Sequence, residues 1–274
     1  MYNSTPNVPD KASTGIQGLD EILAGGLPRH QTYLVEGESG SGKTTLGLQF
    51  LIEGVRQGEE VLYVTLGETE QELRQIAQSH GWSLDGVHIY ELTAMEAIEQ
   101  LASEQTIFHT ADVELSEATD QILQAIQRIR PDRVVFDSIT EIRLLAETPL
   151  RYRRQIFSMR QLLIDLGCTA LFLNNRPSPN DERTLHSLVH GVIFLEQIVP
   201  VYGSMRRNLH VSKMRGMPFH EGHHDFRILT GGLEVYPRIS PADKSRDSDW
   251  ETLSSGVAEL DSLLGGGLET GTAC

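Results

Sequence analysis

The chain has 274 residues, of which 39% are hydrophobic and 22% charged, proportions typical of a globular protein with one large domain or two small ones. Its formal net charge of −15 argues against a nucleic-acid coat, because unspecific binding to polyanions depends on clustered Lys and Arg. No apolar run reaches the roughly 20 residues needed to span a bilayer, and residues 1–6 lack the features of a secretory signal. Cys168 and Cys274 are the only cysteines, which predicts no disulfide framework and a cytoplasmic location.

The first element with a chemical signature is a phosphate-binding loop. Gly37 to Thr44 read GESGSGKT and match the pattern G-x-x-x-x-G-K-[ST], between an apolar run at 33–35 and a segment of helical character beginning at Thr44. The glycines let successive backbone N–H groups converge on an anion, which the dipole of the following helix also favours. We expect Lys43 to reach the β- and γ-phosphates and the Thr44 hydroxyl to bind Mg²⁺. The sequence therefore predicts a nucleoside triphosphate site, the alternative being a glycine-rich turn with an incidental lysine.

Strand-like and helix-like segments alternate through the middle of the chain. Strands are predicted at Val61–Leu66, Val87–Leu92, Arg133–Asp137 and Thr169–Asn174, and helices at Glu70–His80, Ser116–Ile129 and Leu150–Leu166. Apolar residues at helical spacing, such as Ile122, Ile126 and Ile129, support the helices. This alternation predicts an α/β fold with a mostly parallel sheet and helices on both faces.

After Gly191 the predicted elements are strands alone. They cover Val192–Val199, Arg207–Lys213, Phe226–Leu229 and Leu233–Tyr236, with Gly231-Gly232 as a hairpin signal. An antiparallel extension of the sheet is the simplest interpretation. The following stretch to Asp249 is rich in Ser, Asp and Pro, so we predict a domain at 1–240 and a linker at 241–253.

A repeat of the N-terminal segment follows the linker. Residues 13–32 read STGIQGLDEILAGGLPRHQT and residues 254–273 read SSGVAELDSLLGGGLETGTA, with eight identities at an offset of 241 residues. An offset of this length predicts a duplicated domain and not a solenoid, the alternative being chance similarity of two short glycine-bearing helices. A second phosphate loop would begin near position 278, so we expect residues 254–274 to be the truncated start of a second domain.

Two carboxylates are candidates for the chemistry around bound phosphates. Asp137 ends an apolar strand at the sheet edge where ligands collect in parallel folds, and we predict that it supports Mg²⁺. Hydrolysis also requires a group that orients or deprotonates the attacking water. Glu68 follows a strand that we expect beside the one carrying the loop, so it is the best-placed catalytic carboxylate. Its alternative interpretation is a helix-start acid favoured by the dipole.

Two further groups carry two interpretations each. Asn175 and Arg176 end a strand, where they either sense the γ-phosphate or form an ordinary polar turn. Lys213 and Arg215 alternate outward from a strand and are either surface charges or phosphate contacts. The residues alone leave both choices open.

The amino-acid sequence of a histidine-rich segment matches a metal-binding motif. Residues 220–224 read HEGHH and fit the zinc-protease pattern H-E-x-x-H, which requires both histidines one turn apart on a continuous helix. Pro218 precedes the segment, Gly222 interrupts it, and the residues after it are typical of a strand. A zinc protease is therefore not expected.

Together these residues resemble the KaiC family of the RecA-like ATPase superfamily. The resemblance covers essentially the whole chain and is carried by GIQGLD at 15–20, GGL at 25–27, the phosphate loop, FDS at 136–138 and KMRG at 213–216. It implies a RecA-like P-loop NTPase fold and an ATPase that uses ATP and Mg²⁺. Family members often carry two such domains in tandem, which agrees with the repeat.

The resemblance also implies a homo-oligomer, usually a ring of six subunits, with ATP held between neighbours. One subunit would offer the loop residues Gly37, Ser39, Gly40, Ser41, Gly42, Lys43, Thr44 and Thr45. The next subunit would reach across with Lys213, Met214 and Arg215, and Ser79 matches a family position near the adenine.

Departures from the family pattern change what is expected of the chemistry. Family members carry paired acids after the second strand, whereas here the pair reads Gly67-Glu68. If the missing carboxylate is the one that activates water, ATP is bound but hydrolysed slowly or not at all. Residues 222–227 look more like bacterial homologues outside the circadian system, so the resemblance does not by itself imply a clock role. Ser/Thr autokinase activity belongs mainly to the family's second domain and is not expected from these residues alone.

We therefore expect an oligomeric, ATP-hydrolysing domain of a KaiC-like signalling protein. The first alternative is a weakly hydrolysing, nucleotide-gated assembly module. The second is a recombination mediator of the RecA and RadA type, which needs basic or aromatic DNA-binding loops that residues 177–183 do not offer. Neither nucleic acid nor a membrane is expected as a partner.

Overall fold

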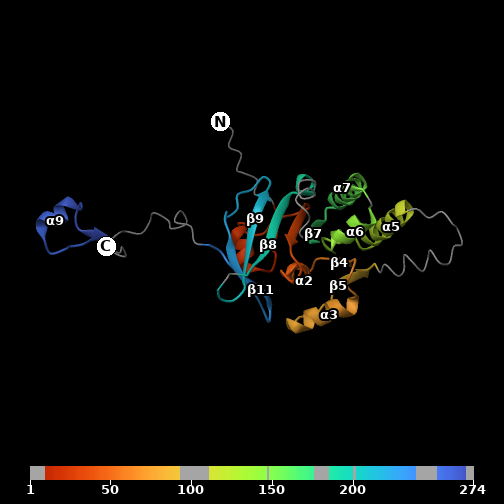
Figure 1. Cartoon of the computed structure of the whole chain (residues 1–274), viewed down its shortest axis with the longest axis horizontal. Coiled ribbons are helices and arrows are strands. Elements are labelled where there is room, and N and C mark those ends of the chain that lie inside the picture. The colour runs from red at the N-terminus through yellow and green to blue at the C-terminus, as the bar shows by residue number, and fades with distance from the viewer. Residues whose placement is uncertain are drawn as a thin grey trace, which may run out of the picture. The chain divides into compact units, whose positions relative to one another are not determined.

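The computed structural model describes residues 10–92, 111–146, 148–175, 185–199, 202–238 and 252–269 (Figure 1). The chain divides into two compact units, residues 1–238 and 239–274, and each is described by itself. Arg176, the segment 177–183, residues 241–251 of the predicted linker and Cys274 lie outside the described residues.

A nine-stranded sheet forms the centre of the first unit, in the order β11-β10-β9-β8-β3-β7-β6-β4-β5. Its parallel part consists of β3 (Thr32–Gly37), β4 (Val61–Thr65), β5 (Val87–Glu91), β6 (Arg133–Asp137), β7 (Thr169–Asn175) and β8 (Gly191–Ile198). The antiparallel part consists of β9 (Arg206–Met214), β10 (His224–Leu229) and β11 (Gly232–Tyr236). The prediction of a RecA-like α/β fold with an antiparallel extension is confirmed.

Helices cover both faces of the sheet, because successive residues of a strand point to opposite sides. Val135 and Leu171 belong to a buried cluster on the side of α1 (Gln17–Ile22), α2 (Lys43–Arg56) and α3 (Glu70–Ser79). Val134 and Phe136 belong to a second cluster, on the side of α5 (Ala111–Ile129), α6 (Ile139–Leu145) and α7 (Pro149–Asp165). Of these helices, the short α6 was not predicted, and α1 was expected only as a short helix without bounds within residues 13–32. Within the described residues, no helix combines the length and the apolar content that crossing a membrane requires.

The expectation that the strand before Glu68 lies beside the strand carrying the loop is wrong. β3 pairs with β7 and β8, whereas β4 pairs with β5 and β6, so two strands separate β3 from β4. The connecting helix α2 lies over these two strands, since a Cβ on Gly47 would come within 3.0 Å of Val135 and 3.3 Å of Leu173. A helix with its side chains is about 10 Å wide, about two strand spacings, so the crossover leaves room for β6 and β7.

The hairpin between β10 and β11 turns one residue earlier than its Gly231-Gly232 signal suggests. Leu229 pairs with Gly232, so the two loop residues are Thr230 and Gly231. Gly232 has a φ of 107° and lies so close to α2 that a Cβ would come within 2.4 Å of Gln49. Only glycine, which has no side chain, fits at position 232, although this residue belongs to strand β11.

The repeated segments adopt the same local structure, with equivalent residues 241 positions apart. Each segment is a short antiparallel strand pair enclosing a helix. In the first unit these elements are β1 (Lys11–Ala12), α1 and β2 (Leu27–Pro28), and in the second they are β12 (Thr252–Leu253), α9 (Ala258–Leu263) and β13 (Leu268–Glu269). The strand β12 thus occupies the end of the predicted linker 241–253.

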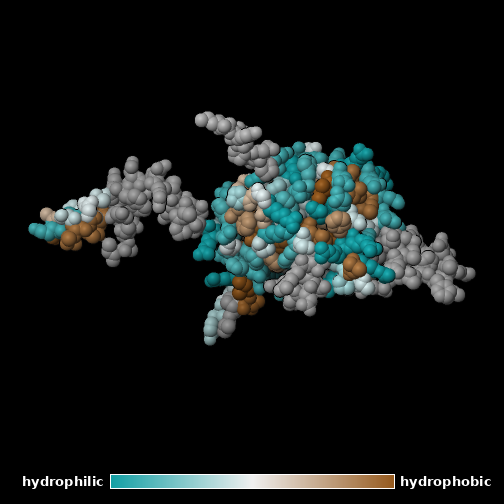
Figure 2. All heavy atoms as spheres, turned by 90° about the horizontal axis from the view of Figure 1, so that it is seen from above, coloured by the Kyte–Doolittle hydropathy of each residue, from teal (hydrophilic) through white to brown (hydrophobic). Residues whose placement is uncertain are grey.

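The two copies share an internal hydrogen bond but differ in burial. Asp20 accepts from Ser13 Oγ at 2.7 Å, and Asp261 accepts from Ser254 Oγ at 2.5 Å. The apolar residues of the first copy are buried, namely Ala12, Ile16, Leu19, Ile22, Leu23 and Leu27. Their counterparts are exposed and give the second unit its apolar surface in Figure 2, namely Leu253, Val257, Leu260, Leu263, Leu264 and Leu268.

A buried arginine connects β6 to the C-terminal half of α2 and to the segment before α1. Arg133 has no exposed surface, pairs with Glu59, and lies over the ring of Phe50 at 4.7 Å. Its guanidinium also donates to Ser13 O at 2.6 Å, Phe50 O at 3.0 Å and Gln57 Oε1 at 3.0 Å. Arg133 therefore satisfies backbone carbonyls that no aliphatic residue could satisfy.

We expect Arg133→Ala to lower the free energy of unfolding by roughly 3–5 kcal/mol, because it leaves a cavity and buried acceptors without donors. Urea denaturation of the nucleotide-free protein measures this change. Arg128→Ala is the matched control, since Arg128 lies exposed on α5 and its replacement should change stability by about 0.5 kcal/mol or less. A loss of less than about 1 kcal/mol for Arg133→Ala would contradict this account.

Candidate functional site

The phosphate-binding loop connects the end of β3 to the start of α2, as predicted from its flanks. Gly42 precedes the first helical residue with a φ of 104°, and Gly40 has a φ of 78°. Both values lie in the left-handed region that glycine adopts without steric cost. At Gly37 the constraint is space, because a Cβ would come within 2.4 Å of Ser41 Oγ and 2.5 Å of Leu195 O. The glycines of the motif are thus explained by backbone conformation and by close packing.

Lys43 folds back over this loop. Its ammonium group donates to Gly37 O at 2.8 Å and to Glu38 O at 2.9 Å, and the residue is 7% exposed. Burial lowers the pKa of Lys43, while the charges of Asp137 and Glu38 act in the opposite direction. The side chain is therefore held at the loop before any ligand arrives, by carbonyl groups that a phosphate can replace as partners.

The Ser41 side chain provides an independent indication of a ligand. Ser41 has no exposed surface, and its Oγ has no hydrogen-bond partner among the described residues. Buried hydroxyl groups are almost always paired. An unpaired, buried hydroxyl inside a glycine-rich phosphate-binding loop fits a site that is completed by an oxygen-rich anion.

Asp137 lies where the prediction placed it, at the carboxyl end of β6 facing the start of α2. One of its oxygens, Oδ2, accepts hydrogen bonds from Thr44 Oγ1 and from Tyr63 Oη, both at 2.6 Å. Burial, and then the charge of Asp137, raise the pKa of Tyr63, so the phenol keeps its proton and remains a donor. The two predicted Mg²⁺ residues are thus in direct contact, and Tyr63 is a supporting residue that the sequence analysis did not identify.

Glu68 reaches the same site from the neighbouring strand β4. Thr65 pairs with Asp137 across the two strands, and its hydroxyl accepts from the Glu68 backbone N–H at 3.0 Å. The Glu68 oxygen Oε2 is buried and has no hydrogen-bond partner among the described residues. Burial raises the pKa of Glu68, and the charges of Asp137 and Glu72 raise it further. Adjacent Gly67 is exposed, and a Cβ there would meet nothing within 4 Å.

These residues line one pocket of about 450 Å³. From the predicted set the pocket wall includes Ser39, Gly40, Gly42, Lys43, Thr44, Thr45, Glu68 and Asp137, together with Asn175 from the open alternatives. Residues that the sequence analysis missed are Ile76 on α3, Ser138 and Glu141 at the start of α6, and Ile228 on β10. They were missed because their place depends on how α3, α6 and β10 pack around the sheet, which no local pattern indicates.

Ser79 does not lie in this pocket wall. It is exposed near the end of α3, and its hydroxyl donates to Ile76 O at 2.7 Å. Ile76, three residues earlier, is the residue of α3 that lines the pocket. A role of Ser79 beside a bound adenine stays a prediction.

Lys213, Met214 and Arg215 lie far from the phosphate loop of their own chain. In the sheet Lys213 is level with Val192 and Leu34, three residues before the end of β3, which corresponds to roughly 10 Å. Its ammonium donates to His186 O and to Val189 O, while exposed Arg215 donates to Ser187 O at 3.0 Å. Met214 is buried against Gly191. Within one chain, therefore, these cations do not join Lys43.

A buried polar network lies next to the start of the phosphate-binding loop and is centred on Glu36. Glu36 has no exposed surface, and its carboxylate accepts from Asn174 Nδ2 at 3.0 Å and contacts His186 Nε2 at 2.9 Å. Asn174 also accepts from Thr140 Oγ1 at 3.1 Å, which connects α6 to the end of β7. The network fixes the strand residue next to Gly37, and the sequence alone did not indicate it because the partners of Glu36, Asn174 and His186, are distant in the chain.

The comparisons with known proteins agree with this geometry. A family profile described as "ATPase: KaiC" matches residues 12–240. A UPF0273 protein of Thermotoga maritima is 31% identical over 83% of this chain and 96% of its own length, and one of Pyrococcus horikoshii is 33% identical over 83% and 94%. The circadian clock oscillator protein KaiC of Synechococcus elongatus is 30% identical over 97% of this chain, which spans 51% of that protein. The profile match covers most of the chain and includes every element of the candidate site, so the chain belongs to the KaiC family of ATPases.

Proposed function

We propose that this chain binds Mg²⁺-ATP in the 450 Å³ pocket and hydrolyses it. The observation that carries the proposal is the contact of Thr44 with Asp137 beside the Lys43 ammonium, at the N-terminus of α2. The backbone N–H groups of the loop would hold the phosphates with Lys43, and Thr44 and Asp137 would hold the ion. When bound, Mg²⁺ neutralises charge on the phosphates and supplies electrostatic stabilisation.

The charge balance of the pocket favours a divalent cation. Among the described residues its wall contains one lysine and three acids, Glu68, Asp137 and Glu141. A triphosphate added to this set would face an excess of negative charge, so a cation of high charge density is needed beside Asp137. Oxygen donors such as Thr44 and Asp137 are the ligands that Mg²⁺ prefers.

Glu68 is the residue that we propose to position and deprotonate the attacking water. Its Oε2 has no hydrogen-bond partner in the part of the chain that the structure describes, so it keeps a lone pair for a water proton, and its raised pKa increases its basicity. The neighbouring Gly67 offers no second carboxylate, although the space beside it is open. This open space is the specific observation behind a second candidate function, a nucleotide-gated assembly module that hydrolyses slowly.

We further propose that the site is shared between subunits of an oligomer. Lys213 and Arg215 lie away from their own pocket, on a part of β9 and its following turn where Arg215 is exposed. A head-to-tail interface would bring these cations to the pocket of the next subunit, where they would balance the acids of its wall. Such an arrangement accounts for two cations that make only backbone contacts in the described part of their own chain.

The first test is steady-state ATP hydrolysis by the sized oligomer. We expect Lys43→Ala to lower kcat by roughly 10²-fold or more and Glu68→Gln by roughly 10²-fold to 10⁴-fold. Glu70→Gln is the matched control, because Glu70 bonds Arg74 on the α3 surface, and it should keep nearly the wild-type rate. If the wild type binds ATP yet hydrolyses it no faster than Glu68→Gln, the assembly module replaces the ATPase.

The second test mixes two inactive variants during assembly. A Lys43→Ala chain keeps its Lys213 and Arg215, whereas a Lys213→Ala/Arg215→Ala chain keeps its loop. In a mixed ring about a quarter of the interfaces combine an intact loop with intact cations, so about a quarter of wild-type activity should return. If mixed oligomers form but stay inactive, the site is not shared. Each variant must first be shown to oligomerise by size-exclusion chromatography.

The raised pKa of Glu68 also predicts a pH-dependent effect on stability. The folded state binds this proton more tightly than the unfolded state, so the carboxylate costs stability at pH values above its ordinary pKa of 4.5. Glu68→Gln should therefore raise the Tm at pH 7 without nucleotide, and the gain should vanish below about pH 4.5. Hydrogen bonds from Thr69 lower the pKa of Glu72, so this carboxylate stabilises the fold at pH 7. Glu72→Gln should therefore lower the Tm at pH 7, and this loss should vanish at pH values below the lowered pKa. Equal Tm differences at both pH values would contradict the assignment.

A further inference from the structure

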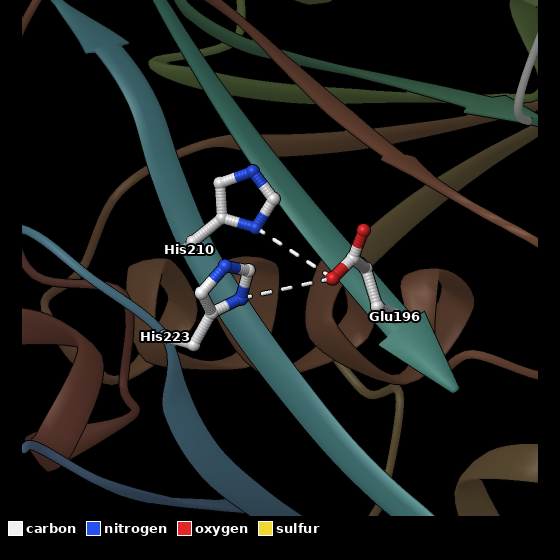
Figure 3. A group of neighbouring side chains, drawn as sticks. All are labelled: Glu196, His210 and His223. Atoms are coloured by element: carbon white, nitrogen blue, oxygen red, sulfur yellow. Dashed lines mark ion pairs between the residues drawn. The ribbon is translucent and has the colours of Figure 1, made fainter. Parts of the chain in front are cut away.

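Three side chains outside the nucleotide pocket converge on one point of the antiparallel part of the sheet. Glu196 lies on β8, His210 on β9, and His223 directly before β10 (Figure 3). The Nδ1 atoms of His210 and His223 lie 3.9 Å and 3.7 Å from the same carboxylate oxygen, Glu196 Oε2. All three potential ligand atoms lie within 4.8 Å of one another.

The separations of these atoms are somewhat wider than those of ligands around a common ion. Both Nδ1–Oε2 distances exceed the roughly 3.2 Å limit of a good N–H···O hydrogen bond. Two ligands of a tetrahedral zinc ion, with bonds of about 2.0–2.2 Å, lie about 3.3–3.6 Å apart. Side-chain rotations that shorten these separations, by at most about 1.5 Å for atoms that lie up to 4.8 Å apart, would therefore bring Glu196, His210 and His223 onto one ion.

We propose that Glu196, His210 and His223 form a binding site for a divalent transition metal ion of the zinc type. Two imidazole nitrogens and one carboxylate oxygen are donors that suit Zn²⁺ and not Mg²⁺, which prefers oxygen ligands. Three protein ligands leave at least one coordination position for water or another ligand. The ion would connect β8, β9 and the segment before β10.

Neighbouring side chains hold the histidine rings in place. The Phe194 ring stacks on His210 with centroids 4.8 Å apart and an interplanar angle of 11°. The His210 and His223 rings lie 4.7 Å apart, and Asn208 Oδ1 lies 3.4 Å from His223 Nδ1, where it can accept a hydrogen bond or approach the ion. A pocket of about 160 Å³ lined by Phe194 and Glu196 provides room for water beside the cluster. Fixed ligand orientation of this kind strengthens metal binding.

The metal-binding pattern in the sequence pointed to a different pair of histidines. Residues 220–224 form no helix, and His224 is buried with its Nε2 3.1 Å from His220 O and its Nδ1 accepting from Arg238 N at 2.8 Å. His224 is thus engaged by the backbone, and only His223 of this segment joins the cluster. His220 is exposed and outside the cluster, which makes it a useful control.

The test measures zinc affinity of the nucleotide-free full chain by competition with a chromophoric chelator. A Cys274→Ser background removes a thiol that could bind zinc elsewhere. We expect one Zn²⁺ per chain, a rise of Tm with zinc concentration, and a Co²⁺ spectrum typical of nitrogen and oxygen ligands. Glu196→Gln and His223→Ala should each weaken binding by at least tenfold, since changes even outside the ligand set cost about 10- to 100-fold.

The controls separate this site from the other places where zinc could bind. His220→Ala should keep the affinity, and so should Asp137→Asn, which alters the nucleotide pocket. Because the His223 side chain is 60% exposed, His223→Ala is expected to fold, and circular dichroism checks this. The proposal is overturned if folded His223→Ala and Glu196→Gln bind zinc as the wild type does, if either control loses it, or if the wild type binds none.

Discussion

The strand β6 has a charged residue at each end, and both are bonded to the same helix. Arg133 at its start donates to Phe50 O and Gln57 Oε1, in the C-terminal part of α2 and just beyond it. Asp137 at its end accepts from Thr44, in the first turn of α2. These two attachments hold the helix antiparallel to the strand along its whole length. The phosphate loop is continuous with α2, so its distance from Asp137 is set by a buried guanidinium at the opposite end of β6 as well as by the local contact of Thr44 with Asp137.

The pocket disfavours the charged forms of two of its own residues. Burial lowers the pKa of Lys43 and raises the pKa of Glu68, so the charged form of each group is less stable than it would be in water. Asp137 accepts hydrogen bonds from Thr44 and Tyr63. An anionic phosphate would favour the charged form of Lys43, and a divalent cation would favour the charged form of Glu68. The hydrogen bonds of Asp137 orient it without using both of its oxygens.

The sequence predicted those features that depend on neighbouring residues. The loop between Gly37 and Thr44 could be recognised because its glycines and lysine act through backbone conformation and short reach, and Asp137 because an apolar strand delivers it to a known edge. The order of the strands could not be derived from the sequence. It depends on how far α2 carries the chain between β3 and β4, and therefore on which positions in the sheet are left for β6 and β7. Glu68 nevertheless reaches the pocket, since β4 is beside β6 and Thr65 is level with Asp137. The cluster of Glu196, His210 and His223 lay beyond prediction for a similar reason, as its members meet only through the register of three strands.

The repeat at an offset of 241 residues shows that a segment can adopt its local structure without burying its apolar side chains. Both copies have the same strand pair, the same helix and the same serine–aspartate bond, so their local structure follows from their own residues. In the first unit the helix is held by tertiary contact, and a Cβ on Gly18 would come within 2.0 Å of Val235 O on β11. Six apolar residues that are buried there are exposed in the second unit, and burying each large one stabilises a fold by about 1.5–3 kcal/mol. That exposed face is the surface that a second sheet of the same family would cover, which is the physical reason to regard residues 254–274 as the proposed start of a second domain.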